Sequence, residues 1–167
     1  MTTSKPYDWS KFRTRIPVKA GIRDIYNAWT TKNGIERWFL KSANFVTAEG
    51  TERTGSVQKG DSYTWTWFGY GEEVNEKGTI LEANGRDFFS FSFAGECKVS
   101  VYIQDEAGEV VVELVQSNIP TDEKGMTSIH IGCMGGWTFY LANLKSYLEG
   151  GIDLRNKNVL IKNVISS

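Results

Sequence analysis

The last third of the chain carries a mostly apolar stripe that constrains every other element. Between Met126 and Leu148 the side chains recur at intervals of three and four residues, which places them on one face of an α-helix. The stripe comprises Met126, His130, Cys133, Met134, Trp137, Tyr140, Leu141, Leu144 and Leu148. Asn143, Lys145 and Ser146 are expected beside or away from it. A single helix cannot bury such a face alone, so the preceding chain must supply a covering surface.

The segment from Asp61 to Gln116 has the pattern of a sheet with one apolar face. Apolar and polar side chains alternate in short runs, separated by turns such as Asn84-Gly85, Ala94-Gly95 and Ala107-Gly108. The inward positions are Tyr63, Trp65, Trp67, Phe89, Phe91, Phe93, Cys97, Val99, Val101, Ile103, Val110, Val112, Leu114 and Gln116. This pattern predicts an antiparallel meander on which the long helix packs.

The first part of the chain predicts one strand followed by two short helices. Residues 11–16 alternate as in a half-buried strand, which Pro17 is expected to end because proline has no N–H to donate. Residues 20–29 have helical periodicity. Asn33 followed by Glu36 indicates a capping box at the start of a second helix.

Composition limits the class of protein. The 167 residues carry a formal net charge of -1, which provides no basic surface for nucleic acid or an anionic membrane. Two cysteines without a signal peptide or a membrane-spanning run indicate reduced thiols and a cytoplasmic location. We expect one domain over residues 1–167, with a core at about 9–150 and an apolar tail at 151–167.

Several short motifs resemble one known family. They are Pro17–Ala20, Ile25–Thr30, Ile35–Phe39, Gly60-Asp61 with Trp65, Gly78–Leu81, Gly136-Trp137 and Leu141–Glu149. Over about Trp9 to Gly151 the chain resembles proteins related to activators of the Hsp90 ATPase, within the START/SRPBCC superfamily of birch-pollen-allergen-like proteins. The resemblance implies the α+β helix-grip fold: a curved antiparallel sheet of about six to seven strands wrapped on a long C-terminal helix, with two short helices after the first strand.

The same resemblance implies a range of functions. The superfamily holds apolar ligands between sheet and helix, and the Hsp90 activators suggest a link to the stress response and contact with a chaperone or client protein. Activators that stimulate the chaperone carry a further N-terminal domain, for which this sequence has no room. We therefore expect a small hydrophobic ligand, with no catalysis and no cofactor. A chaperone-cofactor-like interaction domain with a filled core and a cavity enzyme of cyclase or hydrolase type are the alternatives.

The aromatic side chains expected inside the fold are the candidate ligand site. Large rings that cannot all interdigitate would leave a cavity, whereas an ordinary packed core is the alternative. The candidate ligand-binding residues are Trp38, Phe39, Trp65, Trp67, Phe89, Phe91, Phe93, Gln116, His130, Cys133, Met134, Trp137 and Tyr140. Gln116, Tyr140 and the indole N–H groups would orient the ligand. Residues 48–59 and the short helices around Trp38-Phe39 would form the entrance.

Metal binding and catalysis are weaker interpretations. His130 and Cys133 are three residues apart on the helix, and Cys97 could approach them, but a fourth zinc ligand is not apparent. His130 is instead expected to be a hydrogen-bonded residue at the mouth of the pocket. No acid is placed to orient it for catalysis, and no carboxylate is identified at an inward strand position. We expect no catalytic residue and no metal.

The glycines of the long helix and the C-terminal tail suggest contacts between segments or copies. Gly125, Gly132, Gly135 and Gly136 destabilise a helix, so they indicate either a kink around Gly135-Gly136 or the close approach of another backbone. Residues 152–167 are too apolar for a solvated tail and are expected to dock on their own domain or on a second copy. A homodimer through the outer face of the helix and the tail is therefore a further hypothesis.

Overall fold

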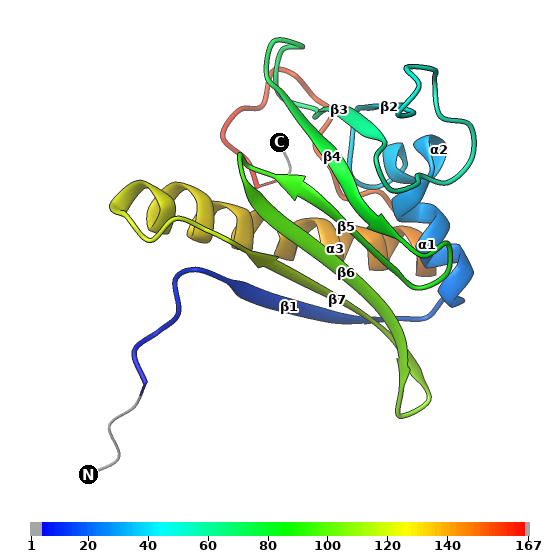
Figure 1. The fold of residues 1–167 in the computed structure, drawn as a ribbon, viewed down its shortest axis with the longest axis horizontal. Coiled ribbons are helices and arrows are strands. Elements are labelled where there is room, and N and C mark those ends of the chain that lie inside the picture. The colour runs from blue at the N-terminus through cyan, green and yellow to red at the C-terminus, as the bar shows by residue number, and fades with distance from the viewer. Residues whose placement is uncertain (1–4, 166–167) are drawn as a thin grey trace.

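A seven-stranded antiparallel sheet curves around one long C-terminal helix (Figure 1). The computed structural model describes residues 5–165. The strands are β1 Phe12–Val18, β2 Ser42–Val46, β3 Ser62–Thr66, β4 Asn75–Ala83, β5 Phe88–Phe93, β6 Cys97–Glu106 and β7 Glu109–Ser117. The helices are α1 Ile22–Thr30, α2 Lys32–Glu36, the π-helical segment η1 Gly125–Ile131 and α3 Gly132–Gly150. This architecture confirms the predicted helix-grip fold. Within residues 5–165, no helix combines the length and apolarity that a membrane span requires.

The meander follows the predicted alternation strand by strand. Each of β2 to β6 pairs with the next strand in the chain, and β1 pairs with β7 to give the order β1-β7-β6-β5-β4-β3-β2. Phe91 is opposite Val99, and Val101 is opposite both Phe89 and Leu114, so these side chains share one face of the sheet. All five are buried. The concave face is therefore the apolar face that α3 covers.

The first strand continues through Pro17, contrary to the prediction. Pro17 is paired with Val111, and β1 ends at Val18. The strand lies at the edge of the sheet, where a proline is tolerated because the missing N–H would point away from the neighbouring strand. The Pro17 carbonyl accepts a hydrogen bond from Lys145 Nζ of α3 at 2.8 Å, which ties the edge strand to the helix.

The predicted capping box at Asn33 is also wrong. Thr31 is the N-cap of α2: its backbone is extended, with φ -110° and ψ 148°, and its Oγ1 accepts from Gly34 N at 3.0 Å. Asn33 lies inside the helix. Glu36 accepts instead from Ala43 N at 2.8 Å, so this carboxylate connects α2 to β2.

The long helix is regular from Gly132 to Gly150 but begins in a wider π-helical segment. The predicted kink around Gly135-Gly136 is absent, and the irregularity is η1. At Gly125 a Cβ atom would lie 1.9 Å from Pro120 O, so only glycine fits there. At Gly132, Gly135 and Gly136 a Cβ atom would meet no atom of the described chain within 4 Å, which excludes the close approach of another of its backbone segments.

Asn143 is fully buried rather than beside the apolar stripe. Its Nδ2 donates to Trp38 O at 2.6 Å and to Asp153 Oδ1 at 3.0 Å, and its Oδ1 accepts from Leu154 N at 2.7 Å. A buried amide is stable only with its hydrogen bonds made, and here its partners come from two remote segments. Asn143 therefore joins α3 both to the end of α2 and to the C-terminal tail.

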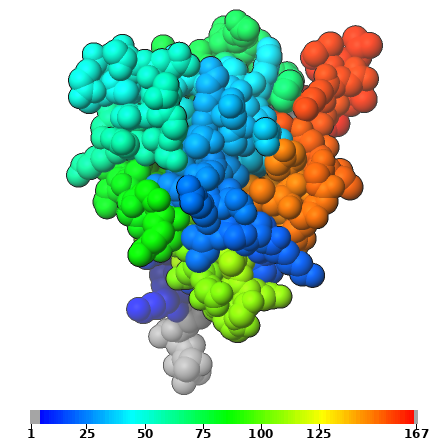
Figure 2. Space-filling view, turned by 90° about the vertical axis from the view of Figure 1, so that its right-hand side faces the viewer, coloured from blue at the N-terminus to red at the C-terminus, as the bar shows by residue number. Residues whose placement is uncertain are grey.

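The tail docks through polar side chains, while its apolar side chains stay exposed. Arg155 is buried and donates to Leu40 O at 2.9 Å, to Glu36 O at 3.0 Å and to both carboxylate oxygens of Asp153. Beyond this point the chain stands out from the body of the molecule, at the upper right of Figure 2. Leu160 is 86% exposed. The expected docking on the same chain is thus made by the side chains of Asp153 and Arg155 and by the backbone of Ile152 and Leu154, while the side chains of Ile152, Leu154 and Val159 to Ile161 stay exposed.

Replacing Gly78 tests the packing of the sheet. A Cβ atom at Gly78 would lie 2.5 Å from Tyr63 Oη and 2.6 Å from its ring, because Tyr63 lies across this glycine on the neighbouring strand. Gly78→Ala should lower the free energy of unfolding by about 1–3 kcal/mol. Gly135→Ala is the control: its methyl group meets nothing, and the better helix former should raise stability by up to about 1 kcal/mol. Urea denaturation measures the free energy of unfolding of both variants. Equal changes in the two variants would contradict the close packing of Tyr63 against Gly78.

Replacing Arg155 tests the anchor of the tail. Burial opposes the ionisation of Asp153, but Arg155, Lys157 and Asn143 outweigh it and hold its pKa below the ordinary 3.8. A carboxyl group whose pKa is lowered in the folded state stabilises the fold at pH values above its unfolded-state pKa. This contribution is lost as the pH falls toward the lower, folded-state pKa. Arg155→Ala should lower the free energy of unfolding by about 3 kcal/mol at neutral pH. The difference from the unmodified protein should shrink below pH 3.8, and a constant difference in acid urea titrations would contradict the ion pair's role.

Candidate functional site

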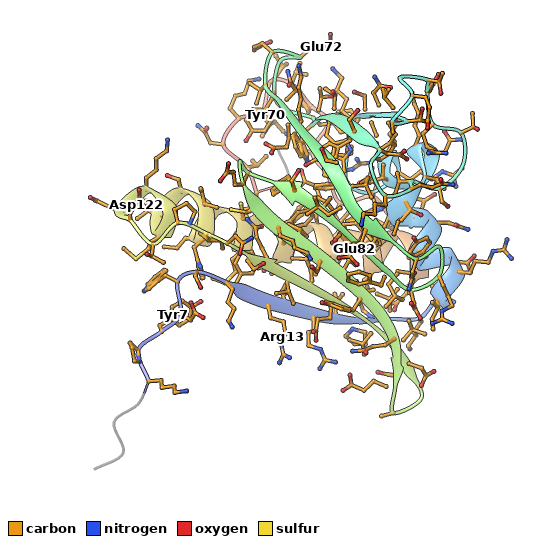
Figure 3. The ribbon with its side chains drawn as sticks, in the orientation of Figure 1. Tyr7, Arg13, Tyr70, Glu72, Glu82 and Asp122 are labelled. Carbon is orange, nitrogen blue, oxygen red and sulfur yellow. The ribbon has the colours of Figure 1, made fainter. Side chains whose placement is uncertain are left out.

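An open pocket of about 380 Å³ lies where the first turns of α3 face the connection between β3 and β4. It is lined by Phe39, Trp67, Tyr70, Val74, Phe93, Ser128, Gly132, Cys133, Gly136, Trp137 and Tyr140. Figure 3 labels Tyr70 on the connection, at the top of the molecule. None of the lining residues is an Asp, Glu, Lys, Arg or His. The pocket is therefore apolar, apart from hydroxyl and thiol groups.

The floor of the pocket is a set of touching aromatic rings. The Phe39 ring centroid lies 5.0 Å from that of Trp137 and 4.8 Å from that of Tyr140, and Phe93 lies 5.2 Å from Trp137. Trp137 is fixed in place because its Nε1 donates to Gln116 Oε1 of β7 at 2.9 Å. This floor is rigid, since each ring is held by its neighbours as well as by the backbone.

One wall of the pocket is bare helix backbone. Ser128, Gly132 and Gly136 recur every four residues and line it together. Residues four apart lie one above the other on a helix, and here two of them have no side chain. Gly135 belongs to the same helix but does not line the pocket. Of the four glycines singled out in the sequence, Gly132 and Gly136 keep this wall open, whereas Gly125 does meet another backbone segment at Pro120.

Eleven of the thirteen predicted site residues divide into two groups in the structure, and His130 and Met134 lie apart from both. Six of them line the pocket: Phe39, Trp67, Phe93, Cys133, Trp137 and Tyr140. Five are buried in the packed interior and do not line it: Trp38, Trp65, Phe89, Phe91 and Gln116. The interior rings contact one another, as Trp65 and Phe91 do at 5.2 Å. The space between sheet and helix is thus filled over most of its length, and the pocket lies at one end.

His130 is not at the mouth of the pocket. It is buried under the segment that precedes β1, where its Nδ1 donates to Trp9 O at 2.8 Å and its Nε2 forms a hydrogen bond with Tyr7 Oη at 2.8 Å. The rings of Tyr7, Trp9 and Phe12 contact it edge-on. Figure 3 shows Tyr7 beside β1, well away from Tyr70. His130 therefore fastens the N-terminal segment, and the nearby Met134 lines a separate groove with Tyr7.

The loop 48–59 is not the entrance either, because none of its residues lines the pocket. The loop is held to the sheet by Arg53, whose Nε and Nη2 donate to the buried Asp61 at 2.7 and 2.8 Å. The rim is formed instead by Tyr70 and Val74 of the β3–β4 connection, which the sequence analysis did not identify. The sequence feature that could have indicated this rim is the aromatic run from Trp67 to Tyr70, which a glycine interrupts.

Cys133 of the pocket lining interacts electrostatically with two side chains of the sheet, Cys97 and Glu76. Burial raises the pKa of the Cys133 thiol and of the Cys97 thiol. Glu76 lies on the inner side of β4, where burial raises the pKa of its carboxyl group although Ala94 N donates to it at 2.8 Å. Its negative charge further raises both thiol pKa values. Glu76 is an unpredicted member of this group, since no inward carboxylate was expected from the sequence.

This group offers neither a reactive thiol nor a metal site. A cysteine with a raised pKa is protonated at neutral pH, and the thiol is a poor nucleophile. Among residues 5–165, no three His, Cys, Asp or Glu side chains are grouped so that they could hold a metal ion. Burial also raises the pKa of Tyr140 to about 12, so its hydroxyl stays neutral. The pocket can therefore bind an uncharged molecule and offer it a hydrogen-bond donor.

The thiol environment can be tested by alkylation. With iodoacetamide, Cys133 should react more slowly at neutral pH than a free thiol, because little thiolate is present. The rate should continue to rise with pH beyond the ordinary thiol pKa of 9.0. Cys97 is fully buried and should react more slowly still. Mass spectrometry of peptides distinguishes the two, and rapid alkylation of Cys133 with a plateau below that pH would contradict this assignment.

Comparison with known proteins places the fold and the family. SSP2350 from Staphylococcus saprophyticus has a TM-score of 0.68 at 18% identity, over 87% of this chain and 96% of its own. The Aha1 dimer from Colwellia psychrerythraea has a TM-score of 0.66 at 20% identity, over 84% and 97%. DynU16, from the dynemicin biosynthetic locus, has a TM-score of 0.67 at 22% identity, over 89% of this chain but 50% of its own. At these identities the likeness concerns the fold.

No curated protein shows significant similarity to this sequence. The sequence profile of one family matches residues 19–149, which extend from the end of β1 to the last turn of α3. This match covers most of the chain and includes every strand from β2 to β7. The chain therefore belongs to the family of Activator of Hsp90 ATPase homolog 1-like proteins.

Proposed function

We propose that the protein binds a small, uncharged, flat apolar or aromatic molecule in this pocket and does not transform it. The observation that supports this most strongly is the combination of an aromatic floor with a wall of bare helix backbone at Gly132 and Gly136. Glycine is unfavourable in a helix interior by about 1 kcal/mol, so two of them at the same wall are retained at a cost to helix stability. Space for a ligand explains that cost.

The size and chemistry of the pocket suit such a ligand. Its volume of about 380 Å³ lies within the range of small-molecule sites, roughly 300–1,000 Å³. A planar ligand can lie on the helix backbone at Gly136 and meet Trp137 and Phe39 with its faces or edges, which are the preferred aromatic geometries. The neutral Tyr140 hydroxyl and Ser128 can hydrogen-bond a carbonyl or hydroxyl group of the ligand. A charged ligand would have no counter-ion among the lining residues and is disfavoured.

The alternative functions have less support from the site. An enzyme would need an acid or base at the reacting group, and no carboxylate or histidine is among the lining residues. A protein-interaction role, with a chaperone, a client or a second copy, is supported by the filled interior and by the family. The relative from Colwellia psychrerythraea is described as a dimer, and DynU16 belongs to a biosynthetic locus. These two relatives therefore support, for this chain, both a protein partner and a small-molecule partner.

A substitution in the glycine wall tests ligand binding. In Gly136→Leu the new side chain would occupy the pocket without striking any protein atom near the Cβ position, so the fold should be preserved. The uncharged fluorescent probe N-phenyl-1-naphthylamine should bind the unmodified protein, with its Kd raised at least about tenfold by Gly136→Leu, or about 1.4 kcal/mol. Fluorescence titration measures the Kd.

Gly135→Leu is the matched control for this experiment. It adds the same side chain to the adjacent position of α3, outside the pocket, and should change the Kd by less than about twofold. Thermal denaturation of both variants checks that the fold is intact. Equal Kd values for the three proteins would place probe binding elsewhere, and absence of binding to the unmodified protein would contradict the proposed function for this ligand class.

A further inference from the structure

The C-terminal tail consists of a polar anchor followed by a short apolar turn. The anchor is Asp153 and Arg155, which are fixed to α2, α3 and each other. The apolar turn is Val159, Leu160 and Ile161, whose side chains are 66%, 86% and 50% exposed. An apolar segment held in water next to a fixed anchor is unfavourable unless something covers it at another stage.

The anchor lies directly beside the rim of the pocket. The Arg155 guanidinium is 5.2 Å and the Lys157 ammonium is 5.1 Å from the ring centroid of Phe68. Phe68 lies between the lining residues Trp67 and Tyr70. Arg155 and Asp153 also act on Tyr140, a lining residue. Burial raises the pKa of Tyr140, the positive charge of Arg155 lowers it in part, and the negative charge of Asp153 raises it further. The tail therefore leaves the body of the protein at the edge of this pocket.

The apolar turn has a defined shape. Asn158 Oδ1 accepts from Leu160 N at 3.0 Å, Asn156 Oδ1 accepts from Asn158 N at 3.0 Å, and Asn156 Nδ2 donates to the carbonyls of Asn158 and Ile161 at 3.2 Å. Ile161 N closes the turn on Asn158 O at 3.1 Å. These bonds place Leu160, the most exposed of the three, at the tip. A turn that is already formed loses less conformational freedom on docking than an unstructured tail does.

We propose that the turn Val159–Ile161 is a movable cover of the pocket, which folds over a bound ligand on the same molecule. This inference rests on the proposed ligand-binding function. Only two residues separate Leu160 from Lys157, which lies on the ring of Phe68, so the turn begins beside the rim residue Tyr70 and can reach the pocket by moving as a unit. The turn has no charged side chain, and neither has the lining of the pocket, so the two surfaces match.

In the structure the turn stands away from the pocket, and the lining residues alone offer it little contact area. Docking would bury the three apolar side chains but would also immobilise the residues between Lys157 and Ile161. A ligand that fills the space between the aromatic floor and the turn adds the missing apolar contact, so the closed form is favoured only when the site is occupied. The cover then slows the departure of the ligand more than its arrival, since arrival takes place on the open form.

The test compares the dissociation rate of N-phenyl-1-naphthylamine from three full-length proteins by stopped-flow fluorescence. The first variant combines Val159→Ser, Leu160→Ser and Ile161→Ser, all at exposed positions where polar side chains leave the fold intact. The control combines Ile152→Ser and Leu154→Ser, which are also exposed but precede Arg155. The first variant should release the probe about tenfold faster than the unmodified protein, and the control should release it at the unmodified rate.

Each outcome separates the cover from the site itself. If the probe binds the unmodified protein and all three proteins release it equally fast, the cover is wrong while ligand binding stands. If the control accelerates release as much as the first variant does, the effect is a general one of the tail and the cover is again wrong. A release rate that slows with protein concentration would assign the cover to a second copy and overturn the intramolecular form. If the unmodified protein binds no probe, both proposals fail for this ligand class.

Discussion

Trp137 connects the packed interior with the pocket, and the rest of the structure depends on how it is held. Its indole ring contacts Trp29 of α1, Phe39 and both Phe91 and Phe93 of β5, at centroid separations of 5.0 to 6.2 Å. Its Nε1 donates to Gln116 of β7. A single side chain of α3 therefore fixes the helix against an N-terminal helix and two strands. The opposite edge of the same ring forms the floor of the pocket, so core packing and site geometry cannot change independently.

If the turn Val159–Ile161 covers the pocket as proposed, the open and covered forms are close in energy. Complete burial of an aliphatic side chain contributes about 1.5–3 kcal/mol, and Val159, Leu160 and Ile161 are already partly buried to different extents. Fixing the backbone of one residue costs about 1–2 kcal/mol, and docking would fix the few residues that join Lys157 to the turn already formed. The two terms are of similar size, so neither form is strongly favoured without a ligand. The apolar surface of a bound molecule is large enough to decide between them.

The strands, the covering helix and the aromatic composition of the site were predictable from sequence because they depend on local periodicity. Alternation in Phe89, Phe91 and Phe93 identifies a strand and its buried face wherever the strand lies. The pairing of polar groups was not predictable in this way. Asn143 is buried because Trp38 O and Asp153 satisfy its amide, and His130 is buried because Tyr7 and Trp9 O bind its ring. These partners are remote in sequence, and nothing near either residue indicates them.

The position of the pocket was not predictable for a related reason. Its rim at Tyr70 and Val74 lies in a connection without periodicity, and the side that faces α3 depends on the twist of β3 and β4. The bare wall at Gly132 and Gly136 has a consequence for how the protein can change. Alanine at either position would strengthen the helix and meet no neighbour, so mutations that increase thermal tolerance are easiest to find there. Adaptation of this protein to heat would thus first narrow the space available to a guest molecule.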